Sequence, residues 1–333
     1  MNKVIFLIAA PKPKIKGTDA LWNEVEIIAK HFGGEVLSIY PFKKARRFSP
    51  KVLFGRFNSK AIKQKILSAE TIHVVSPRLV YFPFLHAFSQ PKVITVAARV
   101  NAHVSSNKYN HIVVNNKRDA LTLKGLNFKN VTLIPTIYPG YASINKEKRN
   151  KEKPLKLLYA SGPWTKQQLE TKGFVNLLKA LKQNSQVNLT VLLRGSNEKA
   201  LQALVKRYGL SKQVAIVNKK IDINETLKAH DACILLSKFS HDVKAFPHSL
   251  IESILSGAPV LLNKSIAMAD FVTQNNLGVV IDDIETTNIL EGIDELTSQY
   301  SIYQENCMRF NADYFSAAPI IKKYKLLYEQ LAK

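Results

Sequence analysis

The segment that decides the fold is Lys244-Ala-Phe-Pro-His-Ser-Leu-Ile-Glu252, followed directly by Ser-Ile-Leu-Ser-Gly257-Ala-Pro-Val260. Proline suits the first turn of a helix, where its missing N–H costs nothing, and the residue before it avoids the α region. The pattern predicts a helix over 249–256 that stops at Gly257, and then a buried strand. Such a helix start binds anions. With Glu252 one turn inside, the segment suits a ligand that carries phosphate and hydroxyl groups. The alternative is an ordinary crossover with a solvated glutamate.

Length and composition indicate a globular protein of two domains. The chain has 333 residues, of which 46% are hydrophobic, and single cores stop growing near about 250–300 residues. Its apolar runs are far shorter than the roughly 20 residues that span a bilayer, so a transmembrane helix is not expected. Two cysteines, Cys233 and Cys307, build no disulfide framework. This usage is typical of a reducing compartment, and we expect a cytoplasmic protein.

The positive charge lies mostly in the first half of the chain. The formal net charge is +23. Residues 1–150 hold 25 Lys/Arg and 7 Asp/Glu, which gives +18, whereas residues 151–333 hold 23 and 18, which gives +5. This asymmetry predicts an anionic partner for the first half.

The densest basic segment, 43–65, has phenylalanines between its charges. Basic residues near an anionic leaflet contribute about 1 kcal/mol each, and aromatic rings can sit in the interface. Nucleic acid would also attract such charges, but zinc-finger, helix-turn-helix and RNP patterns are not found. A membrane surface is therefore preferred over nucleic acid or a merely basic surface. The residues predicted to face the membrane or acceptor are Lys43, Lys44, Arg46, Arg47, Phe48, Lys51, Phe54 and Arg56.

Alternating short apolar runs and helical patterns predict an α/β fold with two Rossmann-like, doubly wound parallel sheets. The first domain covers 1–144, and a polar stretch over 145–154 is interpreted as a linker. The second domain covers 155–315, and a helix over 316–333 is expected to pack back toward the first. An apolar, aromatic helix is expected over 79–88. Ligands of such sheets bind outside the carboxyl ends of the strands, which places a site in a cleft between the domains.

Five motifs follow one another in the second half. They are Leu157-Leu-Tyr-Ala-Ser-Gly162, Lys172-Gly173 at a helix start, Leu192-Leu-Arg194-Gly195, Asp231-Ala-Cys-Ile-Leu-Leu-Ser237 and the opening segment. In this order they resemble the second domain of a GT-B glycosyltransferase, most closely the retaining family-four enzymes (glycosyl transferases group 1). The resemblance covers 155–285 well and 1–145 only as a fold pattern. It implies transfer of a sugar from a nucleoside-diphosphate sugar.

The resemblance also implies roles for individual residues. Lys172 would contact the donor diphosphate, with Lys166 as a second cation, and such charges stabilise a leaving nucleotide diphosphate. Glu252 would bind the ribose hydroxyls. Gly17, in the loop after the first strand, would let the backbone approach a phosphate. The remaining donor-binding candidates are Gly162, Arg194, Lys244, Ala245, Phe246, Pro247, His248 and Ser249. For Lys166 and Arg194 a solvated surface cation is the alternative.

The sequence departs from the family pattern at Lys244, where the family has a glutamate that contacts the transferred sugar. A lysine there could pair with an acidic sugar or phosphate, or could be a surface replacement. His241 and Asp242 precede the motif and are favoured as ordinary loop residues. Metal-binding patterns are not found, so no cofactor or metal is expected. The expected partners are a nucleotide sugar and a lipid-linked or surface-polysaccharide acceptor at the cytoplasmic membrane face. The alternatives are a catalytically inactive sugar- or anion-binding protein, and a soluble glycosyltransferase acting on protein or metabolite.

Overall fold

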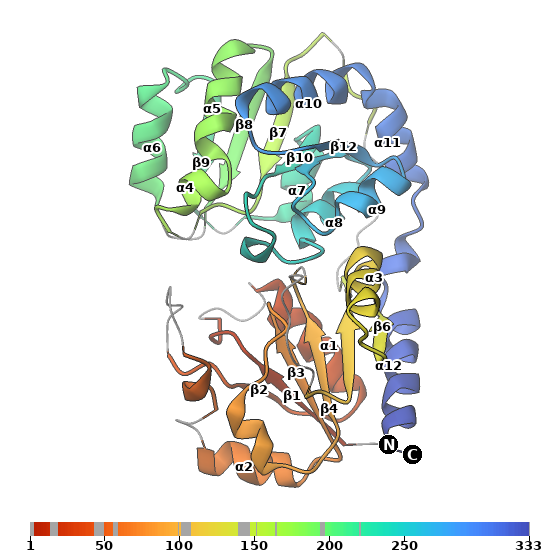
Figure 1. Cartoon of the computed structure of the whole chain (residues 1–333). Coiled ribbons are helices and arrows are strands. Elements are labelled where there is room, and N and C mark those ends of the chain that lie inside the picture. The colour runs from red at the N-terminus through yellow and green to blue at the C-terminus, as the bar shows by residue number, and fades with distance from the viewer. Residues whose placement is uncertain are drawn as a thin grey trace. The chain divides into compact units, whose positions relative to one another are not determined.

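The chain folds into two compact units, which are shown in the computed structural model of Figure 1. Unit 1 comprises Met1–Pro139 and Asp313–Lys333, and unit 2 comprises Gly140–Ala312. Each unit holds a six-stranded parallel sheet with helices around it, which confirms the predicted α/β architecture. The residues that the structure describes are 3–13, 19–42, 50–55, 59–98, 100, 108–138, 147–150, 152–163, 165–193, 197–219 and 221–332.

The sheet of unit 1 has the strand order β2-β1-β3-β4-β5-β6. Its strands are β1 (Val4–Ile8), β2 (Val36–Ser38), β3 (Thr71–Ser76), β4 (Lys92–Val96), β5 (His111–Val114) and β6 (Val131–Leu133). The α-helices of this unit are α1 (Ala20–His31), α2 (Ser59–Leu67), α3 (Lys117–Gly125) and α12 (Ala317–Leu331). Asp19 begins α1 by accepting hydrogen bonds from the backbone N–H groups of Leu21 and Trp22, which the free amides of a helix start require.

Both faces of this sheet are covered, as the unbroken apolar run of β1 requires. Alternate side chains point to opposite faces of a strand. Ile5 and Leu7 belong to the core cluster that includes residues of α2. Val4, Phe6 and Ile8 belong to the cluster under α1 and α12. The sheet is therefore the middle of three layers.

The expected helix over 79–88 is wrong in length and type. Only Pro83–Ala87 is helical, as the short 3₁₀ helix η2, and a second one, η1, covers Lys51–Leu53. Phe82 and Leu85 are buried in the core. Proline at 83 starts the turn, but the segment is too short to repeat an α-helical face.

The C-terminal helix α12 belongs to unit 1. Ile320, Tyr324, Leu327 and Tyr328 are buried on one face of it, at helical spacing. The Tyr328 hydroxyl lies 2.6 Å from Nδ1 of His73, a fully buried residue of β3. Nε2 of the same ring lies 2.7 Å from the Thr95 hydroxyl. Both nitrogens of this histidine are thus hydrogen-bonded in the core.

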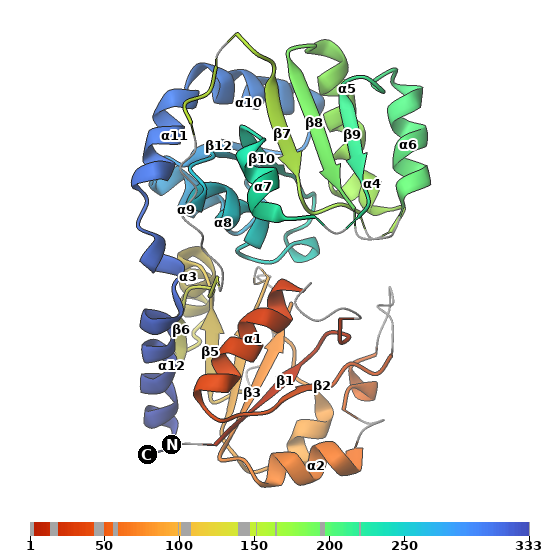
Figure 2. The ribbon, with the colours of Figure 1, turned by 180° about the vertical axis from the view of Figure 1, so that it is seen from behind.

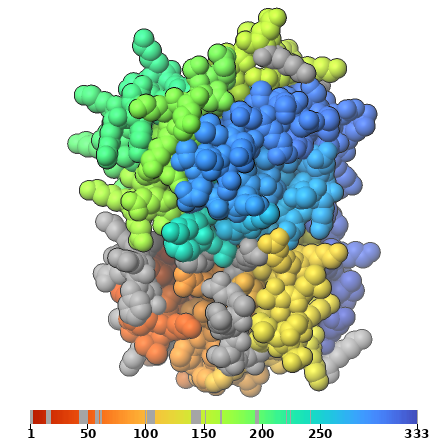
Figure 3. All heavy atoms as spheres, turned by 45° about the horizontal axis from the view of Figure 1, so that its top comes forward, coloured from red at the N-terminus to blue at the C-terminus, as the bar shows by residue number. Residues whose placement is uncertain are grey.

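The sheet of unit 2 has the strand order β12-β11-β10-β7-β8-β9. Its strands are β7 (Leu155–Tyr159), β8 (Val187–Leu192), β9 (Val214–Val217), β10 (Ala232–Leu235), β11 (Val260–Asn263) and β12 (Gly278–Ile281), and Figure 2 shows the first three side by side. Between them run α4 (Gln168–Thr171), α5 (Phe174–Gln183), α6 (Glu198–Arg207), α7 (Ile223–Lys228), the 3₁₀ helix η3 (Ser240–Asp242), α8 (His248–Leu255) and α9 (Ala269–Gln274). After β12 come α10 (Thr286–Ser298), α11 (Tyr300–Arg309) and the 3₁₀ helix η4 (Ala312–Phe315). Helices α5 and α10 lie side by side, and Figure 3 shows them in green and blue.

The strand order of unit 2 reverses between β7 and β10. The chain first moves outward from β7 to β8 and β9, and then returns to place β10 on the other side of β7. Consecutive crossovers therefore diverge at the carboxyl ends of β7 and β10. In open α/β sheets this switch point is where ligands bind.

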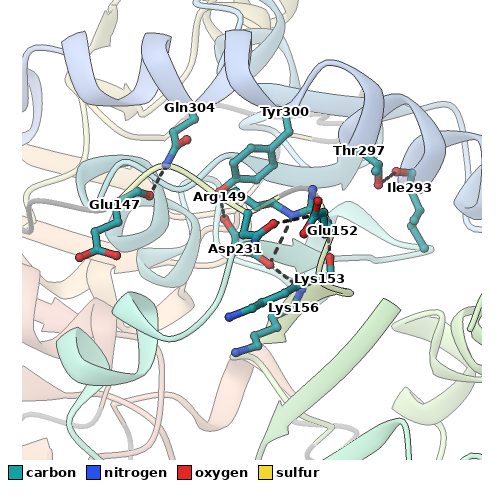
Figure 4. Close-up of polar contacts among 11 residues, drawn as sticks. Glu147, Arg149, Glu152, Lys153, Lys156, Asp231, Ile293, Thr297, Tyr300 and Gln304 are labelled. Atoms are coloured by element: carbon teal, nitrogen blue, oxygen red, sulfur yellow. Dashed lines mark hydrogen bonds and ion pairs between the residues drawn. The ribbon is translucent and has the colours of Figure 1, made fainter. Parts of the chain in front are cut away.

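The described part of the predicted linker is fastened to unit 2, as Figure 4 shows. The Arg149 side chain is only 6% exposed, with Nε 3.6 Å from Oδ2 of Asp231 and the guanidinium over the Tyr300 ring. The same carboxylate accepts a hydrogen bond from the backbone N–H of Lys156. Gln304 donates its side-chain amide to the Glu147 carbonyl. This segment is thus an integral edge of unit 2.

We expect His73 to make the stability of unit 1 depend on pH. Burial, with a smaller contribution from His111, lowers the pKa of His73 from 6.5 to about 3. Below pH 6.5 the unfolded chain therefore binds a proton at His73 that the folded protein does not bind, so the free energy of unfolding falls as the pH drops. This residue alone should remove about 2 kcal/mol between pH 7 and pH 5. Urea unfolding across this range should show a flatter pH slope for His73→Asn. The exposed His86→Asn is the control, and an unchanged slope for His73→Asn would refute the assignment.

We expect Asp231→Ala to destabilise unit 2 by about 3 kcal/mol, because it leaves a buried guanidinium without its counter-charge. Chemical denaturation of the full chain measures the change in the free energy of unfolding. The control is Glu225→Ala, which removes the exposed pair between Lys228 and Glu225 and should cost less than about 1 kcal/mol. Equal losses in the two variants would contradict a structural role for the Arg149 contact.

Candidate functional site

The candidate site lies at the switch point of unit 2, where Ser161 and Gly162 follow β7. A side chain at 162 has no room, because a Cβ atom there would lie 2.6 Å from the Leu192 carbonyl oxygen and 2.5 Å from Cδ2 of Leu193. Only glycine lets the chain that leaves β7 pass so close to the chain that leaves β8. Close packing therefore explains the glycine at 162, which the sequence predicts for donor binding.

Lys172 brings a buried positive charge to this point. The side chain is only 2% exposed, and its Nζ donates to the carbonyl oxygen of Ser161 (3.0 Å), to the hydroxyl of the same residue (3.1 Å) and to the Gly162 carbonyl (3.4 Å). Carbonyl dipoles at the carboxyl end of β7 thus solvate the ammonium group. Gly173, with φ +68, turns the chain from α4 into α5 at the same corner.

The segment Lys244–Ser249 forms the turn that leads into α8. Ala245 and Phe246 are 1% and 2% exposed, and the Phe246 ring packs against Phe271 with centroids 5.4 Å apart. Pro247 is the N-cap, so α8 begins at His248 and ends at Leu255, one residue earlier at each end than the sequence predicts. The first turn of α8 carries no acidic residue. The Lys244 Nζ lies 3.4 Å from Nε2 of His248.

Glu252 and Ser249 face β10 from α8. Cys233 of β10 is fully buried, and burial is the main cause that raises the pKa of its thiol to about 12. The Glu252 charge raises the pKa further, whereas a hydrogen bond with the Ser249 side chain lowers it. Both α8 residues therefore lie close to the thiol. Glu252 itself is half-buried.

Several predicted residues do not join this cluster. Lys166 is exposed, just before α4. The prediction for Phe54 as a membrane-facing ring is wrong, because it is 7% exposed and packs against Tyr40 and Phe82 in the core of unit 1. Lys51, in η1, is exposed. The predicted residues that lie outside the described ranges are Gly17, Lys43, Lys44, Arg46, Arg47, Phe48, Arg56 and Arg194.

The described residues contain neither a membrane-spanning helix nor a cluster of metal ligands. No helix in these ranges is both long and apolar enough to cross a membrane. No group of three or more His, Cys, Asp or Glu side chains in the same ranges is arranged to hold a metal ion.

Residues 143–312, just over half of the chain, match the family model described as glycosyl transferases group 1. The chain belongs to this family. An uncharacterized glycosyltransferase of Methanocaldococcus jannaschii, MJ1069, is 25% identical over 218 residues, which are 62% of this chain and 55% of that protein. The chain thus spans about half the length of this curated relative.

Solved structures of glycosyltransferases share the fold. The sucrose-phosphate synthase of Thermosynechococcus elongatus superposes with a TM-score of 0.74 at 15% identity, over 99% of both chains. Anabaena HepE, in complex with UDP and glucose, superposes with a TM-score of 0.71 at 16% identity, over 99% of this chain and all of that one. These likenesses confirm the predicted GT-B architecture.

The part of the chain that matches the group 1 family contains all the described residues of the site. Polar residues beyond the predicted ones lie beside Lys172: Ser161 accepts from its Nζ, the Tyr159 hydroxyl lies 3.0 Å from its carbonyl oxygen, and the adjacent Thr171 hydroxyl donates to Asp242. In the sequence, Tyr159 and Ser161 belong to a strand motif without an assigned role, Thr171 lies outside the five motifs, and Asp242 is favoured as an ordinary loop residue. A hydroxyl at the end of an otherwise apolar strand is the one signal that marks Tyr159.

Proposed function

We propose that this group 1 family member is a glycosyltransferase that takes a sugar from a nucleoside-diphosphate sugar. The observation that carries the proposal is the buried Lys172 ammonium at the switch point of unit 2. A buried cation suits an anionic ligand. The backbone N–H groups at the start of α8 carry partial positive charge and can donate hydrogen bonds to the same anion. Glu252 would hold hydroxyl groups of the nucleoside. HepE, which has the same fold, was solved with UDP and glucose.

The chemistry would rest on charge stabilisation. As the glycosidic bond of the donor breaks, negative charge grows on the departing nucleoside diphosphate, and a fixed cation lowers the energy of that state. The Lys172 ammonium has three protons, and among its contacts are the neutral oxygen atoms of Ser161 and Gly162. We propose that the 3.4 Å contact with Gly162 exchanges for a donor oxygen. Transfer with retention and without a metal belongs to the same proposal.

We also propose that unit 1 docks on the cytoplasmic face of a membrane and presents a lipid-linked or surface-polysaccharide acceptor. Unit 1 holds 26 Lys/Arg and 8 Asp/Glu, a net charge of +18, which supports this proposal. Among the described residues, Lys60 and Lys63 are exposed on α2. Val52 and Leu67, which are 58% and 59% exposed, add apolar surface to η1 and α2. Charged and apolar groups together suit an anionic interface.

A nucleoside diphosphate should stabilise the protein through unit 2. A thermal-shift panel of UDP, GDP, ADP and their sugars should reveal one that raises Tm, by mass action. Lys172→Met and Glu252→Gln should each lower the affinity for that nucleotide by about tenfold or more, because hydrogen bonds to charged groups contribute about 1.5–3 kcal/mol. Lys228→Met, at an exposed site on α7, is the control. A panel without any stabilising nucleotide would refute the donor site, and binding without turnover would favour an inactive sugar-binding protein.

Binding to liposomes tests the docking surface. The protein should float with vesicles that contain anionic lipid and not with neutral vesicles. Charge reversal at Lys43, Lys44, Arg46 and Arg47 should reduce the bound fraction at least tenfold, since each basic residue contributes about 1 kcal/mol near the surface. Reversal at Lys179, Lys182, Lys199 and Lys206 of unit 2 is the matched control. Equal flotation of the two variants would contradict docking through unit 1.

A further inference from the structure

We propose that Thr171 and Asp242 are positioning residues of the donor site. Their hydrogen bond fixes the corner that carries Lys172 to the loop that leads into the turn 244–249. The inference rests on the proposed function, because it assigns these residues to the same ligand site. They contact other parts of the site rather than reacting atoms.

The bond joins two segments that are distant in the sequence. The Thr171 hydroxyl donates to Oδ2 of Asp242 at 3.0 Å. Thr171 is 8% exposed, and it is the last residue of α4, directly before Lys172. Asp242 is the last residue of η3, two residues before Lys244. A hydrogen bond between a hydroxyl and a carboxylate is charge-assisted and so among the stronger ones.

Hydrogen bonds to backbone atoms connect the same two segments near the start of the loop. The backbone N–H of Lys238 donates to the Thr171 carbonyl at 2.6 Å. The fully buried Tyr159 hydroxyl lies 3.0 Å from the carbonyl oxygens of both Lys172 and Leu236. The loop between β10 and α8 is therefore fastened to the lysine corner near its start by the Lys238 amide and the Tyr159 hydroxyl. Near its middle, the side-chain bond of Asp242 with Thr171 makes a further connection to the same corner.

The Asp242 bond would matter for nucleotide binding because it helps to fix the distance between Lys172 and the start of α8. A single diphosphate can touch both the Lys172 ammonium and the start of α8 only if their separation is fixed. Misplacement by about 1 Å can cost a factor of 100 in a reaction. Phe246, packed on Phe271, holds the turn against α9, whereas Thr171 holds the preceding loop against the lysine. A bond that connects the two anion-binding elements before the ligand arrives lowers the cost of ordering them.

A double-mutant cycle on nucleotide affinity tests the inference. The probe is the nucleoside diphosphate that stabilises the wild type in the thermal-shift panel, with UDP tried first. Thr171→Val and Asp242→Ala should each weaken binding by about tenfold. The double variant should be no weaker than the worse single variant, because both remove the same bond. Thr171→Ser, which keeps the hydroxyl, and Asp242→Asn, which keeps an acceptor oxygen, should bind nearly as well as the wild type.

Thr136→Val is the matched control. In unit 1 the buried Thr136 hydroxyl donates to the Glu24 carboxylate at 2.8 Å, so the substitution removes the same kind of bond away from the site. It should lower stability without changing the nucleotide Kd. Asp242 is only half-buried, so Asp242→Ala carries the test if Thr171→Val unfolds.

Wild-type affinity in both single variants, or losses that simply add in the double variant, would overturn the positioning role while leaving the donor site intact. Loss of stability with an unchanged Kd would do the same, because it would show a structural bond only. A wild type that binds no nucleotide would refute the proposed function itself.

Discussion

The site of this protein depends on one buried cation. The Lys172 ammonium lies at the carboxyl end of β7, where oxygen atoms of Ser161 and Gly162 take the place of water. Burying a charge is costly unless it is solvated by such groups. The close approach of β7 and β8 at Gly162, the left-handed corner at Gly173 and the hydroxyl of Tyr159 all serve to place that lysine.

The topology of unit 2 explains why a ligand would bind at this point. The sheet begins at β7 in its centre and grows outward in both directions, so the loops after β7 and β10 diverge and leave their ends accessible. Lys172 approaches from the β7 side, and the start of α8 follows β10. Lys172 and the first residue of α8 are 76 positions apart in the sequence and are brought near each other only by the strand order. The bonds of Thr171 with Asp242 and Lys238 connect the lysine corner to the loop that leads into α8.

Much of this architecture was predictable from the sequence. Alternating apolar runs and helical patterns indicated the two sheets, and Pro247 and Gly257 bracketed α8 to within one residue. Membership of the group 1 family was predictable from five motifs in order. Periodicity could not show that Phe54 is buried, because an aromatic residue among charges fits a core and an interface equally well. The bonds of Arg149 with Asp231 and of Thr171 with Asp242 join distant segments, and a single sequence carries no signal for such pairs.

Hydrogen exchange of the full chain, with and without a stabilising nucleoside diphosphate, tests the central claim most directly. Backbone amides shielded by a ligand or by its ordering effect exchange more slowly. We predict slower exchange in three segments of unit 2, 161–162, 171–173 and 244–252, with little change across the sheet of unit 1. Protection confined to other segments, or none at a saturating nucleotide concentration, would contradict the claim that Lys172 and the start of α8 form one anion-binding site.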